Sequence, residues 1–355
     1  MALDLTSLFN RRHPALIGLD IGTSSVKLVE LTSRSPQQFR LERYATEPLA
    51  RGAIVDGNIE HLDQVADAVR RLWKKSRSHA RHVAIGIPSP SVITKKLRLP
   101  AGLPEAQLAM QVEAAAAQYL PFPINEIRLD FDIIGPHGDD EIDVLLAVAR
   151  AEKIDDRVAI IEAIGLKPRV ADIDTFAAQA ALMRRQDALQ PPATTALLQI
   201  RSQYSHLSLL SGTEVLYERE HNFGSLQLTQ AIMRTYDFPQ DIAESRKIAA
   251  DLPADYQARV LQPYLDSTVL EIARAMQLLH SSAQCNQADR LLLSGGGALT
   301  PGLAAAVQAH TRIPTMLVNP FHDMQLANHI PAAQLQRNAA SYLIACGLAM
   351  RRFDH

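Results

Sequence analysis

This sequence has few cysteines, almost no net charge and no long apolar run. It has only two cysteines, Cys285 and Cys346, and their spacing fits neither a metal-binding nor a redox motif. The formal net charge at pH 7 is −2, which gives no electrostatic argument for binding nucleic acid. No run of 18 apolar residues occurs, and the N-terminal residues lack the apolar core of a signal peptide. These absences favour a reducing compartment, and we expect a cytoplasmic protein.

The size and composition are those of an ordinary globular protein. The 355 residues suffice for two domains, and 47% of them are hydrophobic and 21% charged. Ahead of the first predicted strand, Leu5, Leu8 and Phe9 share one face of a very short predicted helix. This N-terminal segment, residues 1–13, is either a frayed terminus or a contact to a membrane or a partner.

The first informative motif is LIGLDIGTSSVKLVEL at Leu16–Leu31, which predicts a strand, a turn and a returning strand. The polar and small residues at this turn are Asp20, Gly22, Thr23, Ser24, Ser25 and Lys27. Backbone N–H groups, hydroxyls and one ammonium together suit a phosphate chain. The alternative for Asp20 is a carboxylate that only caps the turn.

A second motif, LLLSGGGALT at Leu291–Thr300, contains Gly295, Gly296 and Gly297. Three glycines allow the backbone to approach a flat or anionic group closely, although a plain tight turn would also use them. A nucleotide held by both motifs would lie between two lobes.

A weak internal repeat supports two similar lobes. When LIGLDIGTSSVKLVEL is aligned with LLQIRSQYSHLSLL, Ile21 lies over Ile200 and Leu28 over Leu207. The clearest linker, Gln190-Pro191-Pro192, separates the two halves. Between them, Ser91–Lys167 has the pattern of a compact β-α-β-β-α insertion.

Six segments in this order resemble one family. They are IGLDIGTSSVKLVEL, PFPINEIRLDFDIIG, FGSLQLTQAI, LPADYQARVLQP, LLLSGGGALTPGL and YLIACGLAMRRFD. The set resembles the type IV pilus assembly protein PilM family, which is similar to the cell-division protein FtsA. The resemblance covers nearly the whole chain, from about Leu16 to Asp354.

The resemblance implies an α/β actin-like, ribonuclease H-like fold of two lobes and four subdomains. The expected subdomains are a first-lobe core at 14–90 and 168–190 completed by a C-terminal helix at 336–355, an FtsA-like insertion at 91–167, a second-lobe core at 193–224 and 286–335, and a helical subdomain at 225–285.

The resemblance also implies ATP with magnesium in the cleft between the lobes. Asp20 would orient magnesium through water, and Gly22, Thr23, Ser24, Ser25 and Lys27 would surround the phosphates. Glu244 and Lys247 would contact ribose and adenine, unless they are only an exposed helical i,i+3 pair. Gly295, Gly296 and Gly297 would flank the adenosine.

The partner that the resemblance implies is the cytoplasmic N-terminal tail of the inner-membrane protein PilN. Its groove would lie between the first lobe and the insertion, with walls at Leu97, Leu99, Tyr119, Leu120 and Phe122, unless these are core residues. Through PilN the protein would reach PilO at the inner face of the inner membrane and serve pilus assembly and twitching motility.

One turn departs from the family pattern. Where the family has Asp-Ile-Gly, this chain has Gln199-Ile200-Arg201, and Ser225 replaces a second glycine. Gln199 cannot act as a base, and a positive φ would strain Arg201. The guanidinium would pair with phosphates or fill their site, so we expect nucleotide binding with little or no hydrolysis.

Two other functions stay open. A small-molecule kinase of the same superfamily would need a catalytic carboxylate, for which Asp172 and Asp174 are the candidates. An FtsA-like membrane-associated filament protein would need a basic amphipathic C-terminal helix, which Arg351–His355 does not resemble.

Overall fold

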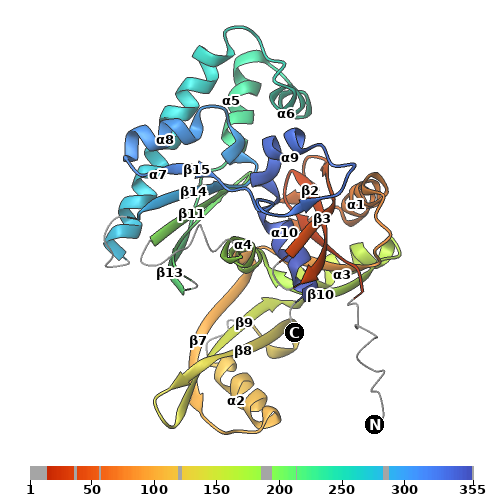
Figure 1. The fold of residues 1–355 in the computed structure, drawn as a ribbon, viewed down its shortest axis with the longest axis vertical. Coiled ribbons are helices and arrows are strands. Elements are labelled where there is room, and N and C mark those ends of the chain that lie inside the picture. The colour runs from red at the N-terminus through yellow and green to blue at the C-terminus, as the bar shows by residue number, and fades with distance from the viewer. Residues whose placement is uncertain are drawn as a thin grey trace, which may run out of the picture.

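The computed structural model describes residues 14–35, 38–55, 57–118, 122–184, 194–212, 214–282 and 288–353. Figure 1 shows two sheet-containing lobes side by side and a smaller unit of strands and one helix extending from them. The predicted linker at Gln190–Pro192, Cys285, and the N-terminal segment lie outside the described residues.

The first lobe is built on a six-stranded sheet in the order β10-β6-β1-β2-β3-β16. Its strands are β1 (Leu16–Ile21), β2 (Ser25–Ser35), β3 (Gln38–Pro48), β6 (His82–Ile87), β10 (Lys167–Ile173) and β16 (Gln325–Leu326). β1, β2 and β3 form an antiparallel meander, and β6 and β10 continue the sheet in parallel. A small hairpin of β4 (Ile54–Val55) and β5 (Asn58–Ile59) precedes α1 (Leu62–Ser76).

The second lobe repeats this arrangement in a five-stranded sheet, β13-β12-β11-β14-β15. Its strands are β11 (Thr194–Ile200), β12 (Ser205–Ser211), β13 (Glu214–His221), β14 (Arg290–Ser294) and β15 (Thr315–Leu317). Again an antiparallel meander leads into two parallel strands. Ile21 and Ile200 end β1 and β11, so the predicted repeat of a hairpin is confirmed.

Alternation along the buried strands places one hydrophobic core between the sheets and one outside each. In β11, Leu197 joins the central core while Leu198 faces the outer one, because successive side chains point to opposite faces. The central core contains α4 (Asp174–Met183) and α10 (Leu343–Met350), with the short helix α9 (Ala332–Asn338) beside it.

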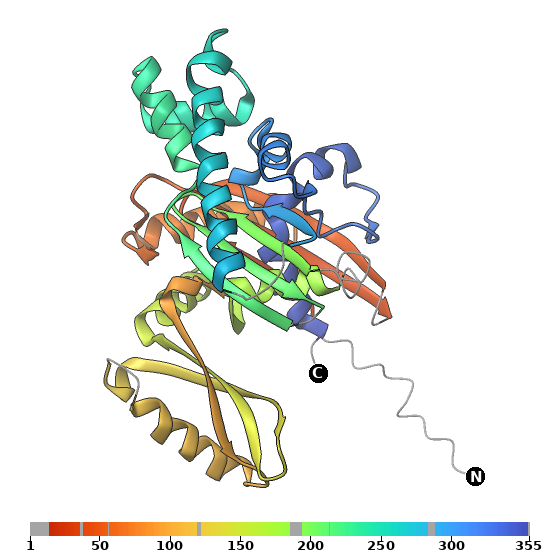
Figure 2. The ribbon, with the colours of Figure 1, turned by 90° about the vertical axis from the view of Figure 1, so that its left-hand side faces the viewer.

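Helices cover the outer face of each sheet. α1 and α3 (Ala151–Ala163) cover the first sheet, and Figure 2 shows α7 (Gln262–Ser282) crossing the outer face of the second. The remaining helices of the second lobe are α5 (Leu226–Tyr236), α6 (Gln240–Ala249) and α8 (Leu303–Thr311). No described helix is long and apolar enough to cross a membrane.

The insertion has its own sheet, β7-β9-β8, covered on one face by a helix. Its elements are β7 (Val92–Pro100), α2 (Glu105–Ala117), β8 (Ile127–His137) and β9 (Glu141–Arg150). We predicted that α3 also belongs to this unit. Instead Ile160 and Ile161 of α3 are buried in the first-lobe core, so the insertion's own core ends with β9.

Helix α10 packs closely against α4 and β1 because a glycine lies at each contact. A Cβ on Gly347 would lie 1.7 Å from the backbone oxygen of Ala177 in α4. On the opposite side, a Cβ on Gly18 of β1 would lie 2.1 Å from the backbone oxygen of Ala345. Both glycines are therefore required for the helix to fit between strand and helix.

We predict that Gly347→Ala lowers the free energy of unfolding by about 3 kcal/mol or more, because a backbone oxygen cannot rotate away from the added methyl group. Chemical unfolding followed by circular dichroism measures this. The control is Gly135→Ala, whose Cβ would meet no atom within 4 Å and which should change stability by about 0.5 kcal/mol at most. Equal unfolding midpoints for the two variants would contradict the prediction.

Candidate functional site

The turn between β1 and β2 is tight, and it follows the buried end of β1 at Asp20 and Ile21. The Gly22 N–H donates to the Ser25 carbonyl at 3.1 Å and closes the turn. Asp20 is paired with Lys27 across the hairpin, and the Lys27 ammonium donates to Ser25 Oγ at 2.9 Å. Burial lowers the pKa of Lys27 below its ordinary value, although the Asp20 carboxylate opposes this shift. The hairpin thus brings together the polar groups that the sequence predicted there.

The equivalent turn of the second lobe carries an arginine, Arg201, where the family pattern has a glycine. Arg201 follows β11, and its guanidinium donates from Nη1 to Asp174 Oδ2 at the start of α4. Its Nη2 lies 3.5 Å from Asp20 Oδ1. The second Asp174 oxygen accepts from the backbone N–H of Ser89 at 3.0 Å. One second-lobe cation therefore bridges two first-lobe carboxylates.

The backbone accommodates Arg201 without the strain that we predicted. Arg201 is absent from the residues with positive φ. Its N–H donates to the Tyr204 carbonyl at 3.1 Å, which closes a turn that any residue can adopt. The expectation of a costly φ was therefore wrong. What arginine changes in place of glycine is the space in the cleft, which its side chain occupies.

Little space remains beside Asp20. The cavity there has a volume of about 20 Å³, which is room for about one water molecule. Its walls are Ile21, Gly22, Thr23, Ile54, Gly57, Pro88, Arg157, Arg201 and Tyr204. Arg157 of α3 is buried, donates to the Lys153 carbonyl at 2.7 Å, and has its pKa lowered to about 10 by that burial. A phosphate chain with its magnesium does not fit this arrangement.

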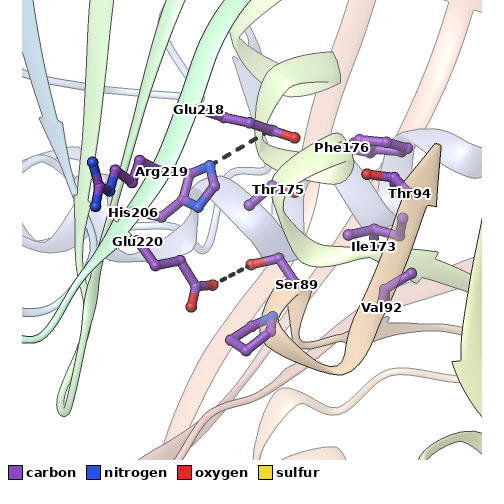
Figure 3. Close-up of a pocket in the computed structure, with 11 residues that line it drawn as sticks. Ser89, Val92, Thr94, Ile173, Thr175, Phe176, His206, Glu218, Arg219 and Glu220 are labelled. Atoms are coloured by element: carbon purple, nitrogen blue, oxygen red, sulfur yellow. Dashed lines mark hydrogen bonds and ion pairs between the residues drawn. The ribbon is translucent and has the colours of Figure 1, made fainter. Parts of the chain in front are cut away.

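A larger cavity of about 250 Å³ lies at the base of the insertion (Figure 3). Its lining residues are Ser89, Pro90, Val92, Thr94, Ile173, Thr175, Phe176, His206, Glu218, Arg219 and Glu220. The cavity lies where both lobes and β7 meet. Sequence reasoning missed it, because its walls come from several distant segments and none of them forms a motif.

The second lobe lines this cavity with the polar residues His206, Glu218, Arg219 and Glu220. Ser89 Oγ donates to Glu220 Oε1 at 3.0 Å, which links the first lobe to the second. Burial raises the pKa of both glutamates. Burial also lowers the pKa of His206 to about 4, so this imidazole is neutral near pH 7.

A family model for the type IV pilus assembly protein PilM matches residues 18–353. The chain belongs to the PilM family. Its fold is similar to that of a solved PilM–PilN type IV pilus biogenesis complex, with 26% sequence identity, a TM-score of 0.82, and coverage of 97% of this chain and 100% of that one.

A more distant similarity concerns the fold alone. The ethanolamine utilization protein EutJ from Carboxydothermus hydrogenoformans is 13% identical, with a TM-score of 0.57 and coverage of 95% of this chain and 89% of that one. Together with the two repeated sheets, these matches confirm the predicted actin-like fold. As a PilM family member, the chain is a pilus assembly protein.

The glycines of the SGGGALT turn have a packing reason. A Cβ on Gly295 would lie 2.3 Å from the Ile200 carbonyl oxygen, and one on Gly297 would lie 2.4 Å from the Ile200 side chain. Gly295 also has φ +88°. A Cβ on Gly296 would meet nothing within 4 Å. The turn therefore lies against the end of β11, and its expected contact with adenosine stays a prediction.

Glu244 and Lys247 form a polar cluster with Thr229 of α5. Lys247 Nζ donates to Glu244 Oε2 at 2.6 Å and to Thr229 Oγ1 at 2.7 Å, and the Thr229 hydroxyl donates to Glu244 Oε2 at 2.6 Å. The pair is i,i+3 as the alternative had it, but it is partly buried against α5 instead of exposed. Its contact with ribose or adenine also stays a prediction.

The described residues that we predicted as groove walls belong to, or pack against, the core of the insertion. Leu97 and Leu99 are only 7% and 8% exposed and belong to the core between the insertion's sheet and α2. The Phe122 ring packs against that core and lies under the Arg150 guanidinium, 4.0 Å from the ring centroid. Tyr119 and Leu120 lie outside the described residues. Leu97 and Leu99 are therefore core residues, which is the alternative that the sequence left open for them.

The two carboxylates considered for a kinase both take part in ion pairs. Asp174 contacts Arg201, and Asp172 Oδ2 accepts from Arg351 Nε at 2.7 Å. No group of three or more His, Cys, Asp or Glu side chains in the described part of the chain could hold a metal ion.

Proposed function

We propose that this chain is a cytoplasmic scaffold of the type IV pilus inner-membrane complex that binds the N-terminal tail of PilN. The similarity to a solved PilM–PilN complex, which extends over the whole of that chain, is the observation that carries the proposal. Through PilN, and indirectly PilO, the protein would be held at the inner face of the inner membrane and would serve pilus assembly and twitching motility.

The cavity of Figure 3 is the place that we propose for the PilN tail. It lies at the junction of the first lobe and the insertion, where the family resemblance puts the groove. Val92 and Thr94 come from β7, and Thr175 and Phe176 come from α4. These side chains offer an apolar wall to a short extended segment.

Scaffolding without ATP turnover agrees with the cleft between the lobes. Arg201 holds Asp20 and Asp174, and nucleotide binding beside Asp20 requires its guanidinium to leave them. Gln199 is 2% exposed and neutral, so it supplies no base to activate water. We propose that ATP binds weakly, because Arg201 must first leave the cleft, and that hydrolysis is slow or absent.

No observation favours the two alternatives. A kinase needs a carboxylate that is free to act on its substrate, and both candidates, Asp172 and Asp174, are held in ion pairs. For an FtsA-like filament protein, the C-terminal segment would have to reach a membrane. Instead Phe353 packs edge-on against Phe39 at 5.1 Å, and Arg352 donates to the Leu31 carbonyl at 2.9 Å.

We predict that a synthetic peptide of the PilN N-terminal tail binds the parent protein, and that Phe176→Ala weakens binding by about tenfold, the loss of about one buried aromatic contact. Isothermal titration calorimetry measures both affinities. Phe122→Ala is the matched control, since Phe122 does not line the cavity, and its affinity should equal the parent's. A parent protein that fails to bind the peptide would refute the proposed function, and equal affinities for the parent and Phe176→Ala would refute the proposed place.

We predict that Arg201→Gly binds ATP with magnesium about tenfold or more tightly than the parent, because the substitution frees both carboxylates and the space between them. Calorimetry with and without magnesium measures this, with the exposed Arg51→Gly as control. Steady ATP hydrolysis by the parent that Asp20→Ala abolishes would contradict the account of the cleft.

A further inference from the structure

We infer that the cavity at the base of the insertion receives one cationic side chain of an extended partner peptide. A lysine or arginine would lay its apolar stem on Val92 and Phe176 and place its charged head between Glu218 and Glu220. The inference rests on the proposed function, because the peptide to which it commits is the PilN tail.

The size of the cavity fits a side chain better than a cofactor. Its volume of about 250 Å³ is below the range of roughly 300–1,000 Å³ typical of small-molecule sites. Its two walls also differ in chemistry. Val92, Ile173 and Phe176 form an apolar wall, and the facing wall from β12 and β13 is polar. An amphipathic side chain, with an apolar stem and a charged end, matches such a pair of walls.

The carboxylates on the polar wall lack a cation of their own. Glu218 and Glu220 are two residues apart on β13, so both project from the same face of the strand. Within the described ranges, no lysine or arginine lies at ion-pair distance from either carboxylate; Glu220 accepts from the Ser89 hydroxyl, and Glu218 lies 3.7 Å from His206 Nε2. Figure 3 shows the neighbouring Arg219 directed away from Thr175 and Phe176.

His206 is an independent sign of a missing ligand group. It is only 4% exposed, and neither of its ring nitrogens has a hydrogen-bond partner in the described structure. A buried polar group without a partner is costly, and a donor entering the cavity would remove that cost. Because the imidazole is neutral, it accepts a hydrogen bond but does not neutralise Glu218.

The strands beside the cavity explain why the occupant is an extended peptide. β13 is the edge strand of the second-lobe sheet, and β7 is an edge strand of the insertion's sheet. β7 lines the cavity with the alternate residues Val92 and Thr94, and β13 lines it with Glu218, Arg219 and Glu220. An extended segment presents its own side chains with the same two-residue repeat and can bond to free strand edges.

Calorimetry with the synthetic PilN tail tests the inference. We expect Glu218→Gln and Glu220→Gln each to weaken binding by about tenfold, because each change removes one partner of a charge pair that the bound peptide would cover. Replacing one particular lysine or arginine of the peptide by glutamine should have the same effect, and the two losses should not add. Glu214→Gln, an exposed position of the same strand, is the matched control and should bind as the parent does.

Exchanging the charges of protein and peptide distinguishes a lost contact from a variant that is misfolded. Glu218→Lys should lose the parent peptide and recover binding when the peptide's anchoring cation is replaced by glutamate. Parent affinity retained in both glutamine variants would overturn the inference and leave the proposed function intact. Failure of the parent protein to bind the peptide at all would overturn both.

Discussion

The bridge from Arg201 to Asp174 and Asp20 is the interaction on which the arrangement of the two lobes depends. It joins the end of β11 to the start of α4 and the end of β1, where the equivalent strands of the two lobes meet. The three charges are buried together, so removing any one leaves the others uncompensated. The same bridge fills the cleft and leaves a volume of about 20 Å³ beside Asp20. The proposed scaffold, which binds its partner in a different cavity, agrees with this constraint.

Much of the fold could be predicted from local pattern. The apolar runs on either side of the Gly22–Ser25 turn indicated a buried hairpin, and every residue of β1 is buried. The weak match of Ile21 to Ile200 identified the repeat that the two sheets display. The C-terminal helix that the resemblance implies is present, and Gly347 allows it to pack closely. The actin-like architecture came from the ordered set of motifs, because no single turn is specific enough to define it.

The points that the sequence left open or missed have physical causes. Leu97 and Leu99 alternate along an edge strand, and alternation alone does not say whether their face meets a helix or a partner; here α2 covers it. The φ of Arg201 was mistaken because a glycine in relatives need not have a positive φ. The cavity at the base of the insertion was invisible because Ser89, Phe176 and Glu218 come together only in three dimensions. The nucleotide contacts of Glu244 and Gly296 stay predictions.

The central claim is that buried charges of the two lobes are coupled, and a double-mutant cycle measures that coupling directly. Unfolding free energies of the parent, Arg201→Met, Asp174→Asn and the double variant suffice. Each single change should cost about 3–5 kcal/mol, and the double variant should cost clearly less than their sum. The exposed pair Arg274–Glu271, at 2.8 Å, is the control and should show a coupling of about 0.5 kcal/mol or less. Additive losses at Arg201 and Asp174 would contradict the account.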